Sequence, residues 1–116
     1  MAKHIITGNT GEKMASKFLE EKGYEVLERN YRYKKAEIDI IAKKENVLVF
    51  VEVKTRKSKL YGEPEEAVNQ SKINLILLAA ENFIESYNWL FDIRFDVIAI
   101  HYTHPAEIVH IQDAFH

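Results

Sequence analysis

Two apolar segments of this chain each carry a pair of charged side chains two residues apart. The segment AEIDIIA contains Glu37 and Asp39, and the segment VLVFVEVKTR contains Glu52 and Lys54. Side chains alternate between the two faces of a strand, so the members of each pair share a face if both segments are strands. Carboxylates that oppose one another in a hairpin repel, and a divalent cation would relieve that repulsion. Mg²⁺ needs only one or two protein carboxylates besides water and substrate phosphates.

The residues KKEN between the two segments are turn-like and predict a hairpin. Its strands would be 36–42 and 47–54, with 43–46 as the loop. This register places Glu37 opposite Glu52, and a slip of one residue would break the arrangement. The face away from the carboxylates is apolar and is expected to face the core; it comprises Ile38, Ile40, Val49, Val51 and Val53.

In this hairpin Asp39 lies on the diagonal from Glu52, about 7–8 Å away. These two carboxylates are candidate ligands of Mg²⁺ or Mn²⁺, and Lys54 would stand beside a bound water or phosphate. A metal ion there would lower the pKa of bound water and stabilise charge on the phosphate oxygens. Spacing leaves a second interpretation open, in which Lys54 neutralises Glu37 and Glu52 in a surface ion-pair network.

Length and composition describe a globular chain. Its 116 residues, 47% of them hydrophobic and 29% charged, are expected to form one domain, residues 1–116, with a buried core. The absence of cysteine excludes disulfides, thiolate metal sites and a cysteine nucleophile. It also suits a reducing compartment, and no apolar run approaches the length of a membrane span. We therefore expect a cytoplasmic protein without a membrane partner.

Charge is distributed unevenly along the chain. The net charge of −2 does not by itself suggest a nucleic-acid binder. Residues 28–59, however, hold ten Lys and Arg against five Asp and Glu, a net charge of +5, whereas the remaining residues hold six against thirteen. Within this segment Arg32 and Lys34 alternate with Tyr31 and Tyr33, a pattern suited to phosphate contacts and base stacking. A solvated basic edge with half-buried tyrosines is the alternative.

The elements that would position these residues follow from periodicity, caps and turns. We expect helices at 7–24 and about 64–87, the second with Pro64 in its first turn, and strands at 24–33, 36–42, 47–54, 91–100 and 107–112. The order αβββαββ predicts an α/β fold with a mixed sheet flanked by helices.

Four stretches together carry a family resemblance: GEKMASKFLEEKGYEVLERNYR, AEIDIIA, VLVFVEVKTR and YGEPEEAVNQSK. Over about residues 8–115 the chain resembles the YraN-like uncharacterised family, which is similar to archaeal Holliday junction resolvases. Asp39 followed by Glu52-Val53-Lys54 also resembles the PD-(D/E)xK signature of restriction-endonuclease-like nucleases. Ile38 stands where that signature has proline, and Ala36 stands where glycine is common.

The resemblance implies a restriction-endonuclease-like three-layer fold and a Mg²⁺- or Mn²⁺-dependent endonuclease that acts on DNA. Branched and single-stranded DNA are the candidate substrates, and resolvase-like relatives act as dimers, so a homodimer is a candidate assembly. Asp39 and Glu52 would be metal ligands, Lys54 the catalytic lysine, and Glu12 an additional catalytic acid that contacts the metal. Glu12 has a competing interpretation as the second member of a capping box with Asn9.

Two further basic residues are candidate DNA contacts. Arg56 follows Lys54 on the same strand face if that strand continues, and Lys72 on the second helix could reach a phosphate, although an exposed helix charge is the alternative. The histidines at 101, 104, 110 and 116 lack metal-site spacing and are expected to be solvated. Two other functions stay open: a catalytically inactive nucleic-acid-binding module with the nuclease fold, and a protein-interaction scaffold.

Overall fold

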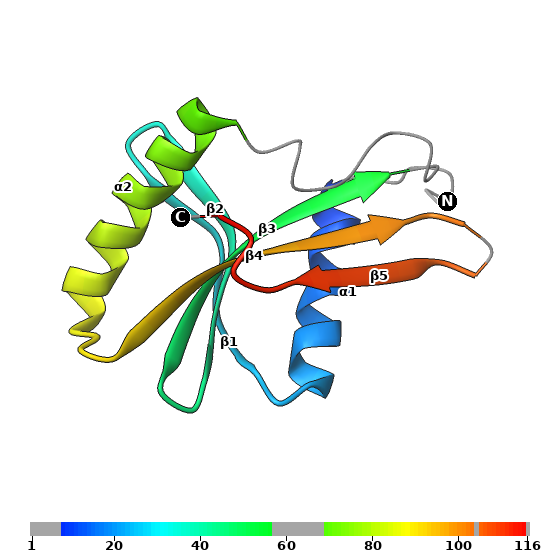
Figure 1. Cartoon of the computed structure of the whole chain (residues 1–116), viewed down its shortest axis with the longest axis horizontal. Coiled ribbons are helices and arrows are strands. Elements are labelled where there is room, and N and C mark those ends of the chain that lie inside the picture. Colours follow the sequence, from blue (N-terminus) through cyan, green and yellow to red (C-terminus); the bar gives the residue numbers. More distant parts are fainter. Residues whose placement is uncertain (1–7, 57–68, 104, 116) are drawn as a thin grey trace.

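The computed structural model describes residues 8–56, 69–103 and 105–115. Their elements are α1 (Gly8–Glu21), β1 (Glu25–Tyr33), β2 (Ala36–Lys44), β3 (Val47–Arg56), α2 (Gln70–Tyr87), β4 (Asp92–His101) and β5 (Glu107–Ile111) (Figure 1). The predicted α/β class and the order αβββαββ are confirmed. The sequence predicts that the second helix begins near residue 64. In the structure α2 begins after its N-cap Asn69. Residues 64–68 lie outside the described residues.

The five strands form one mixed sheet in the order β1-β2-β3-β4-β5. The first three strands are an antiparallel meander, β4 runs parallel to β3, and β5 returns antiparallel to β4. The chain between β3 and β4 includes α2, as a parallel connection requires. No helix in this described part of the chain is both long enough and apolar enough to cross a membrane.

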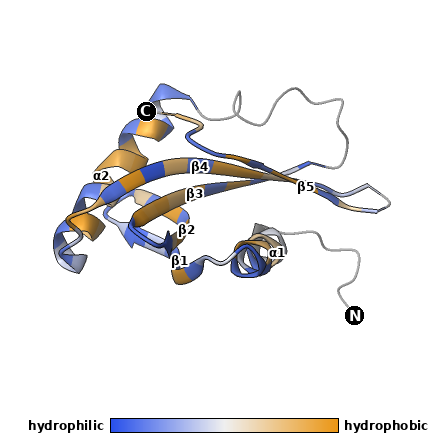
Figure 2. Ribbon diagram, turned by 60° about the horizontal axis from the view of Figure 1, so that its bottom comes forward, coloured by the Kyte–Doolittle hydropathy of each residue, from blue (hydrophilic) through white to orange (hydrophobic). Residues whose placement is uncertain are grey.

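The two helices cover opposite faces of the sheet (Figure 2). Alternation along β3 sends Leu48 and Phe50 toward α2, and sends Val49 and Val51 toward α1. The α2 cluster includes Ile76, Ala79, Ala80, Phe83 and Phe95, and the α1 cluster includes Ala15, Leu19, Ile40, Ile98 and Ile100. This arrangement gives the predicted three layers. Ile38, expected beside Ile40, packs instead in the α2 cluster.

The predicted hairpin register is wrong by two residues. The pairing runs from Lys44 opposite Val47 to Ile40 opposite Val51, which leaves a loop of only two residues, 45–46. Glu45 adopts a φ of 54°, the left-handed conformation that lets so short a loop close. A shift of two residues does not by itself exchange the faces of a strand. Apart from Ile38, the predicted grouping survives: Glu37, Asp39 and Glu52 line one cleft, and Lys54 pairs with Glu52.

Candidate active site

The backbone pairing of β2 with β3 ends directly before the carboxylates. Its last pair is Ile40 with Val51, and one further step brings Asp39 level with Glu52 rather than diagonal to it. Beyond that pair a side chain replaces the backbone as hydrogen-bond acceptor: Asp39 Oδ2 accepts the backbone N–H of Val53 at 2.8 Å. The aspartate therefore bridges the gap between two separating strands, which fixes its carboxylate beside Glu52.

This placement makes the Asp39 carboxyl group hard to ionise. Burial and the neighbouring charge of Glu52 raise the pKa of Asp39 to about 7, although the Val53 N–H and the ammonium of Lys72 oppose the shift. Glu52 itself is only 4% exposed. Two carboxylates in a partly desolvated site repel one another, and a positive charge between them relieves that repulsion.

Two lysines supply positive charge to Glu52. Lys54 Nζ lies 3.2 Å from Glu52 Oε2, and Lys72 Nζ forms an ion pair with the same oxygen. Burial lowers the pKa of Lys54 against the opposing pull of Glu52. For Lys72, burial favours the neutral amine, but its bond to Glu52 outweighs burial and raises the pKa. The pKa values of the two lysines are therefore shifted in opposite directions.

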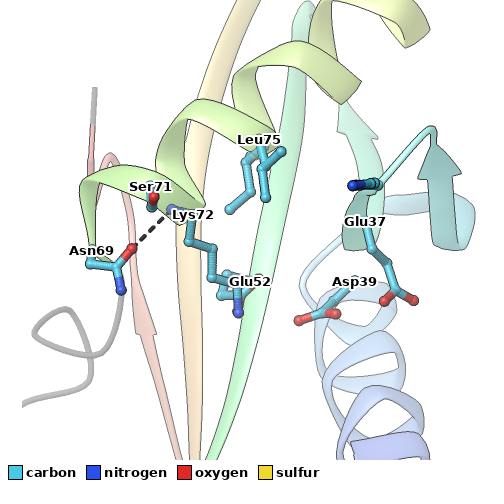
Figure 3. Close-up of a pocket in the computed structure, with 9 residues that line it drawn as sticks. Glu37, Asp39, Glu52, Asn69, Ser71, Lys72 and Leu75 are labelled. Atoms are coloured by element: carbon cyan, nitrogen blue, oxygen red, sulfur yellow. Dashed lines mark hydrogen bonds and ion pairs between the residues drawn. The ribbon is translucent and has the colours of Figure 1, made fainter.

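A cleft of about 390 Å³ opens between β2 and the first turns of α2 (Figure 3). Glu37 and Asp39 project from β2 on one side, and Lys72 reaches from α2 toward Glu52 on the other. The remaining lining residues are Lys35, Asn69, Ser71, Leu75 and Ile76. Sequence reasoning missed Asn69 and Ser71, because only the packing of α2 brings them to the charged strand face.

Asn69 fixes the start of α2 at this cleft. Its side-chain oxygen accepts the backbone N–H of Lys72 at 2.9 Å, and its own backbone is extended, as in an N-cap. The cap determines where the helix begins and therefore which residue of its first turn faces Glu52. Lys72, whose alternative interpretation was an exposed helix charge, thereby becomes part of the site.

The structure brings Glu12 to the same carboxylates from the opposite helix. The Asn30 amide donates a hydrogen bond to Glu12, and a second hydrogen bond joins Glu12 to Asp39. Burial raises the pKa of Glu12, and the charge of Glu37 adds to the increase. The helix begins at Gly8, and its first turn holds no acidic residue, so Glu12 does not occupy the capping-box position.

Asn30 is a residue that sequence reasoning missed. It lies inside β1 with a φ of 57°, a conformation that asparagine tolerates better than most residues. The β1–β2 pairing joins Arg29 to Ile40 and Tyr31 to Ile38, and skips Asn30 and Asp39 between them. The distortion turns the Asn30 amide toward Glu12. A lone Asn in a strand-like run is the one sequence signal for this irregularity.

Close packing at Gly11 sets the distance of α1 from the sheet. A Cβ at this position would lie 2.6 Å from the Thr55 methyl carbon, well inside contact distance. We expect Gly11→Ala to lower the free energy of unfolding by about 1–3 kcal/mol, despite the better helix propensity of alanine. Urea unfolding measures the loss. Thr55→Ser removes the opposing methyl group and should restore most of it in the double variant; equal losses with and without Thr55→Ser would contradict the contact.

The other predicted basic residues lie around the site. The β3 strand continues to Arg56, as predicted, which keeps that residue on the face of Lys54. Arg32 is exposed and pairs with Glu37 at 3.6 Å, which gives Glu37 a partner at the margin of the cleft. Lys34, in the β1–β2 turn, lies over the ring of Tyr33 at 5.3 Å. Their contacts with DNA stay predictions.

The expectation of solvated histidines is wrong for two of them. His101 is 6% exposed, and His110 Nε2 lies 2.7 Å from Oδ2 of the fully buried Asp96. Along β4, Phe95 packs in the α2 cluster and Ile98 packs in the α1 cluster. Because side chains alternate along a strand, Asp96 faces α1, on the side of the sheet away from the cleft. His104 and His116 lie outside the described residues.

The carboxylates suit a hard divalent cation. Asp39 and Glu52 offer oxygen donors from adjoining strands. Burial and, after it, the charge of Glu52 raise the pKa of Asp39, and a cation would relieve the repulsion between the two carboxylates. Among the described residues, no three His, Cys, Asp or Glu side chains are grouped so that they alone could hold a metal ion. An ion there would complete its coordination with water and substrate phosphate, as Mg²⁺ ordinarily does.

Comparison with known proteins places this chain. The model of the uncharacterised protein family UPF0102 matches residues 11–100. The chain belongs to the UPF0102 family. UPF0102 proteins of Flavobacterium psychrophilum and Flavobacterium johnsoniae are 45% and 43% identical to it, over all of this chain and 98% of each relative. A UPF0102 protein of Cytophaga hutchinsonii is 47% identical over 95% of this chain and 96% of the relative.

Membership confirms the resemblance to the YraN-like family. The family match spans Glu12, Asp39, Glu52, Lys54 and Lys72, so the whole carboxylate and lysine cluster lies within the part shared with other UPF0102 proteins.

Proposed function

We propose that this UPF0102 protein is a metal-dependent endonuclease that hydrolyses phosphodiester bonds in DNA. One observation carries the proposal: Asp39 and Glu52 come level where β2 and β3 separate, with Lys54 beside Glu52 and a cleft in front of them. Hydrolysis of a phosphodiester needs charge neutralisation at phosphate and a positioned water, and these groups are suited to both.

Each residue has a distinct role in the proposed reaction. Asp39 and Glu52 would hold Mg²⁺ or Mn²⁺, and Glu12 would steady Asp39 or bind the ion through water. When bound, the ion supplies stabilisation of charge on the phosphate oxygens and a lower pKa for bound water. Lys54 would orient the attacking water, and burial lowers the pKa of its ammonium, which therefore gives up a proton more readily.

Branched and single-stranded DNA are the proposed substrates, and a homodimer is the proposed assembly for a branched substrate with two strands to cut. The basic segment 28–59, with its net charge of +5, supports attraction to the phosphate backbone. The same segment also favours the second candidate, a nucleic-acid-binding module without turnover.

Cleavage assays with purified protein test the proposal. The protein would be incubated with branched, single-stranded and duplex DNA in Mn²⁺, in Mg²⁺ and in EDTA. We expect metal-dependent cleavage that disappears in Asp39→Ala and in Lys54→Ala and persists in Glu20→Ala, which changes an exposed acid on α1. Cleavage that survives in Asp39→Ala would contradict the assigned site. Salt-sensitive DNA binding without cleavage in any metal would favour the non-catalytic module.

A further inference from the structure

We infer that Lys72 pairs with the Glu52 carboxylate in the metal-free protein and leaves it for the substrate phosphate when a divalent cation binds that carboxylate. The inference rests on the proposed function of the site. It assigns Lys72 two successive partners, first the carboxylate and then the phosphate, so that metal loading and DNA capture are coupled.

The crowding at one oxygen is the first argument. Lys54 Nζ and Lys72 Nζ both pair with Oε2 of Glu52, whose side chain is 4% exposed. The negative charge of Asp39, the other candidate ligand, also attracts the Lys72 ammonium. A divalent cation on this carboxylate would therefore lie close to two ammonium groups, and like charges so close repel strongly in a partly desolvated site. At least one lysine has to withdraw.

The anchoring of the two lysines decides which one withdraws. Lys54 lies on β3, two residues from Glu52, and only 17% of its side chain is exposed, so packing restrains it. Lys72 approaches from a different element, the first turn of α2, and 41% of its side chain is exposed. A lysine carries its ammonium on a flexible four-carbon stem, so Lys72 has both the room and the freedom to move.

The surroundings of Lys72 indicate where its ammonium goes. Lys72 lines the cleft of about 390 Å³ in which a phosphate beside Asp39 and Glu52 would lie. Asn69 and Ser71, at the positive end of α2, line the same cleft. An ammonium released from Glu52 thus remains within reach of an anion, and a phosphate oxygen offers it a replacement charge partner.

This exchange predicts opposite effects of one substitution on two ligands. Removing the Lys72 ammonium removes a competitor for Glu52, so metal affinity without DNA should increase. The same change removes a phosphate contact, so DNA affinity should decrease. If Lys72 served only to hold α2 against the sheet, its substitution would not increase metal affinity while decreasing DNA affinity.

Calorimetric titration of Mn²⁺ into DNA-free protein tests the inference. We expect Lys72→Met to bind Mn²⁺ about tenfold more tightly than the wild type, a change of the size that neighbours of metal ligands produce. Lys35→Met is the matched control, since Lys35 lines the same cleft. It should change Mn²⁺ affinity by less than about threefold, the long-range effect of one charge. Lys72→Arg retains the charge and should bind Mn²⁺ as the wild type does.

The outcomes separate this inference from the proposed function. Equal Mn²⁺ affinity in wild type and Lys72→Met, with binding abolished by Asp39→Ala, would overturn the exchange and leave the metal site intact. Equal gains from Lys72→Met and Lys35→Met would also overturn it, because the effect would be general electrostatics. Absence of Mn²⁺ binding by the wild type would overturn both proposals. Circular dichroism of each variant, with thermal unfolding, verifies that the titrated protein is folded.

Discussion

Asp39→Asn is expected to slow metal-dependent DNA cleavage severely and, at the same time, to stabilise the metal-free protein at alkaline pH. Loss of the charged ligand should lower the cleavage rate by about a thousandfold, because several kcal/mol of transition-state stabilisation depend on the bound ion. Asparagine keeps an oxygen that can accept the N–H of Val53, so the strand gap should be preserved. Single-turnover cleavage assays measure the loss.

The stability effect follows from the pKa of Asp39, which is about 7 in the folded protein against 3.8 ordinarily. Because the folded-state value is raised, the native state retains a proton that the unfolded chain releases. The resulting stabilisation is fully present below about pH 4 and is lost as the pH rises through about 7. At pH 8 the buried, ionised Asp39 destabilises the folded protein, whereas the neutral asparagine does not.

Urea unfolding in EDTA at pH 4 and at pH 8 compares wild type with Asp39→Asn. We expect the variant to be more stable at pH 8 by on the order of 1–3 kcal/mol, and the difference to shrink toward zero at pH 4. Asp92→Asn, which changes an exposed aspartate at the start of β4, is the control. A difference that is the same at both pH values would show that burial and Glu52 do not raise the pKa of Asp39.

The second large effect is expected from Asp96→Ala, which should lower the free energy of unfolding by about 3–5 kcal/mol. Asp96 is fully buried and accepts hydrogen bonds from Arg94 Nε and Nη2, both at 2.9 Å. It also contacts His110 Nε2 at 2.7 Å and accepts the Asp113 N–H at 3.0 Å. Without the carboxylate, the partly buried guanidinium of Arg94 would keep the hydrogen bond to the Tyr24 hydroxyl but lose its charge partner.

Chemical denaturation of single and double variants measures this effect. Arg94→Met combined with Asp96→Ala should be more stable than Asp96→Ala alone, because removing both charges leaves no uncompensated ion. Additive losses would contradict the pairing. Cleavage per folded molecule should match the wild type, since Asp96 faces α1 and the cleft lies on the α2 side.

The same network makes the stability of the protein decrease at acidic pH. Burial favours the protonated form of Asp96, but its hydrogen bonds to His110, Arg94 and the Asp113 N–H outweigh burial and lower its pKa. A carboxyl group with a lowered folded-state pKa stabilises the protein above its ordinary pKa, and that contribution is lost as the pH falls through the folded value. Asp39 and Asp96 therefore act in opposite directions on stability as the pH changes.

The local pattern of the sequence determined the order of elements and the face of each charged side chain. Alternation in β2 and β3 depends only on neighbouring residues, so Glu37, Asp39, Glu52 and Lys54 could be assigned to a common face before their partners were known. The two-residue error in register did not disturb this assignment, because an even shift preserves faces. Turn geometry at Glu45, which fixed the register, lacks a distinctive sequence signal such as glycine.

Tertiary structure alone decided what meets those side chains. Lys72 reaches Glu52 because α2 packs against β2, and Glu12 reaches Asp39 because Gly11 lets α1 approach the sheet closely. Asp96 on β4 bonds to His110 on β5 and to Asp113 beyond it, contacts that the alternation within each strand does not predict. Periodicity within a segment reports which side faces inward, but not which other segment lies there, since long-range contacts depend on how whole elements pack.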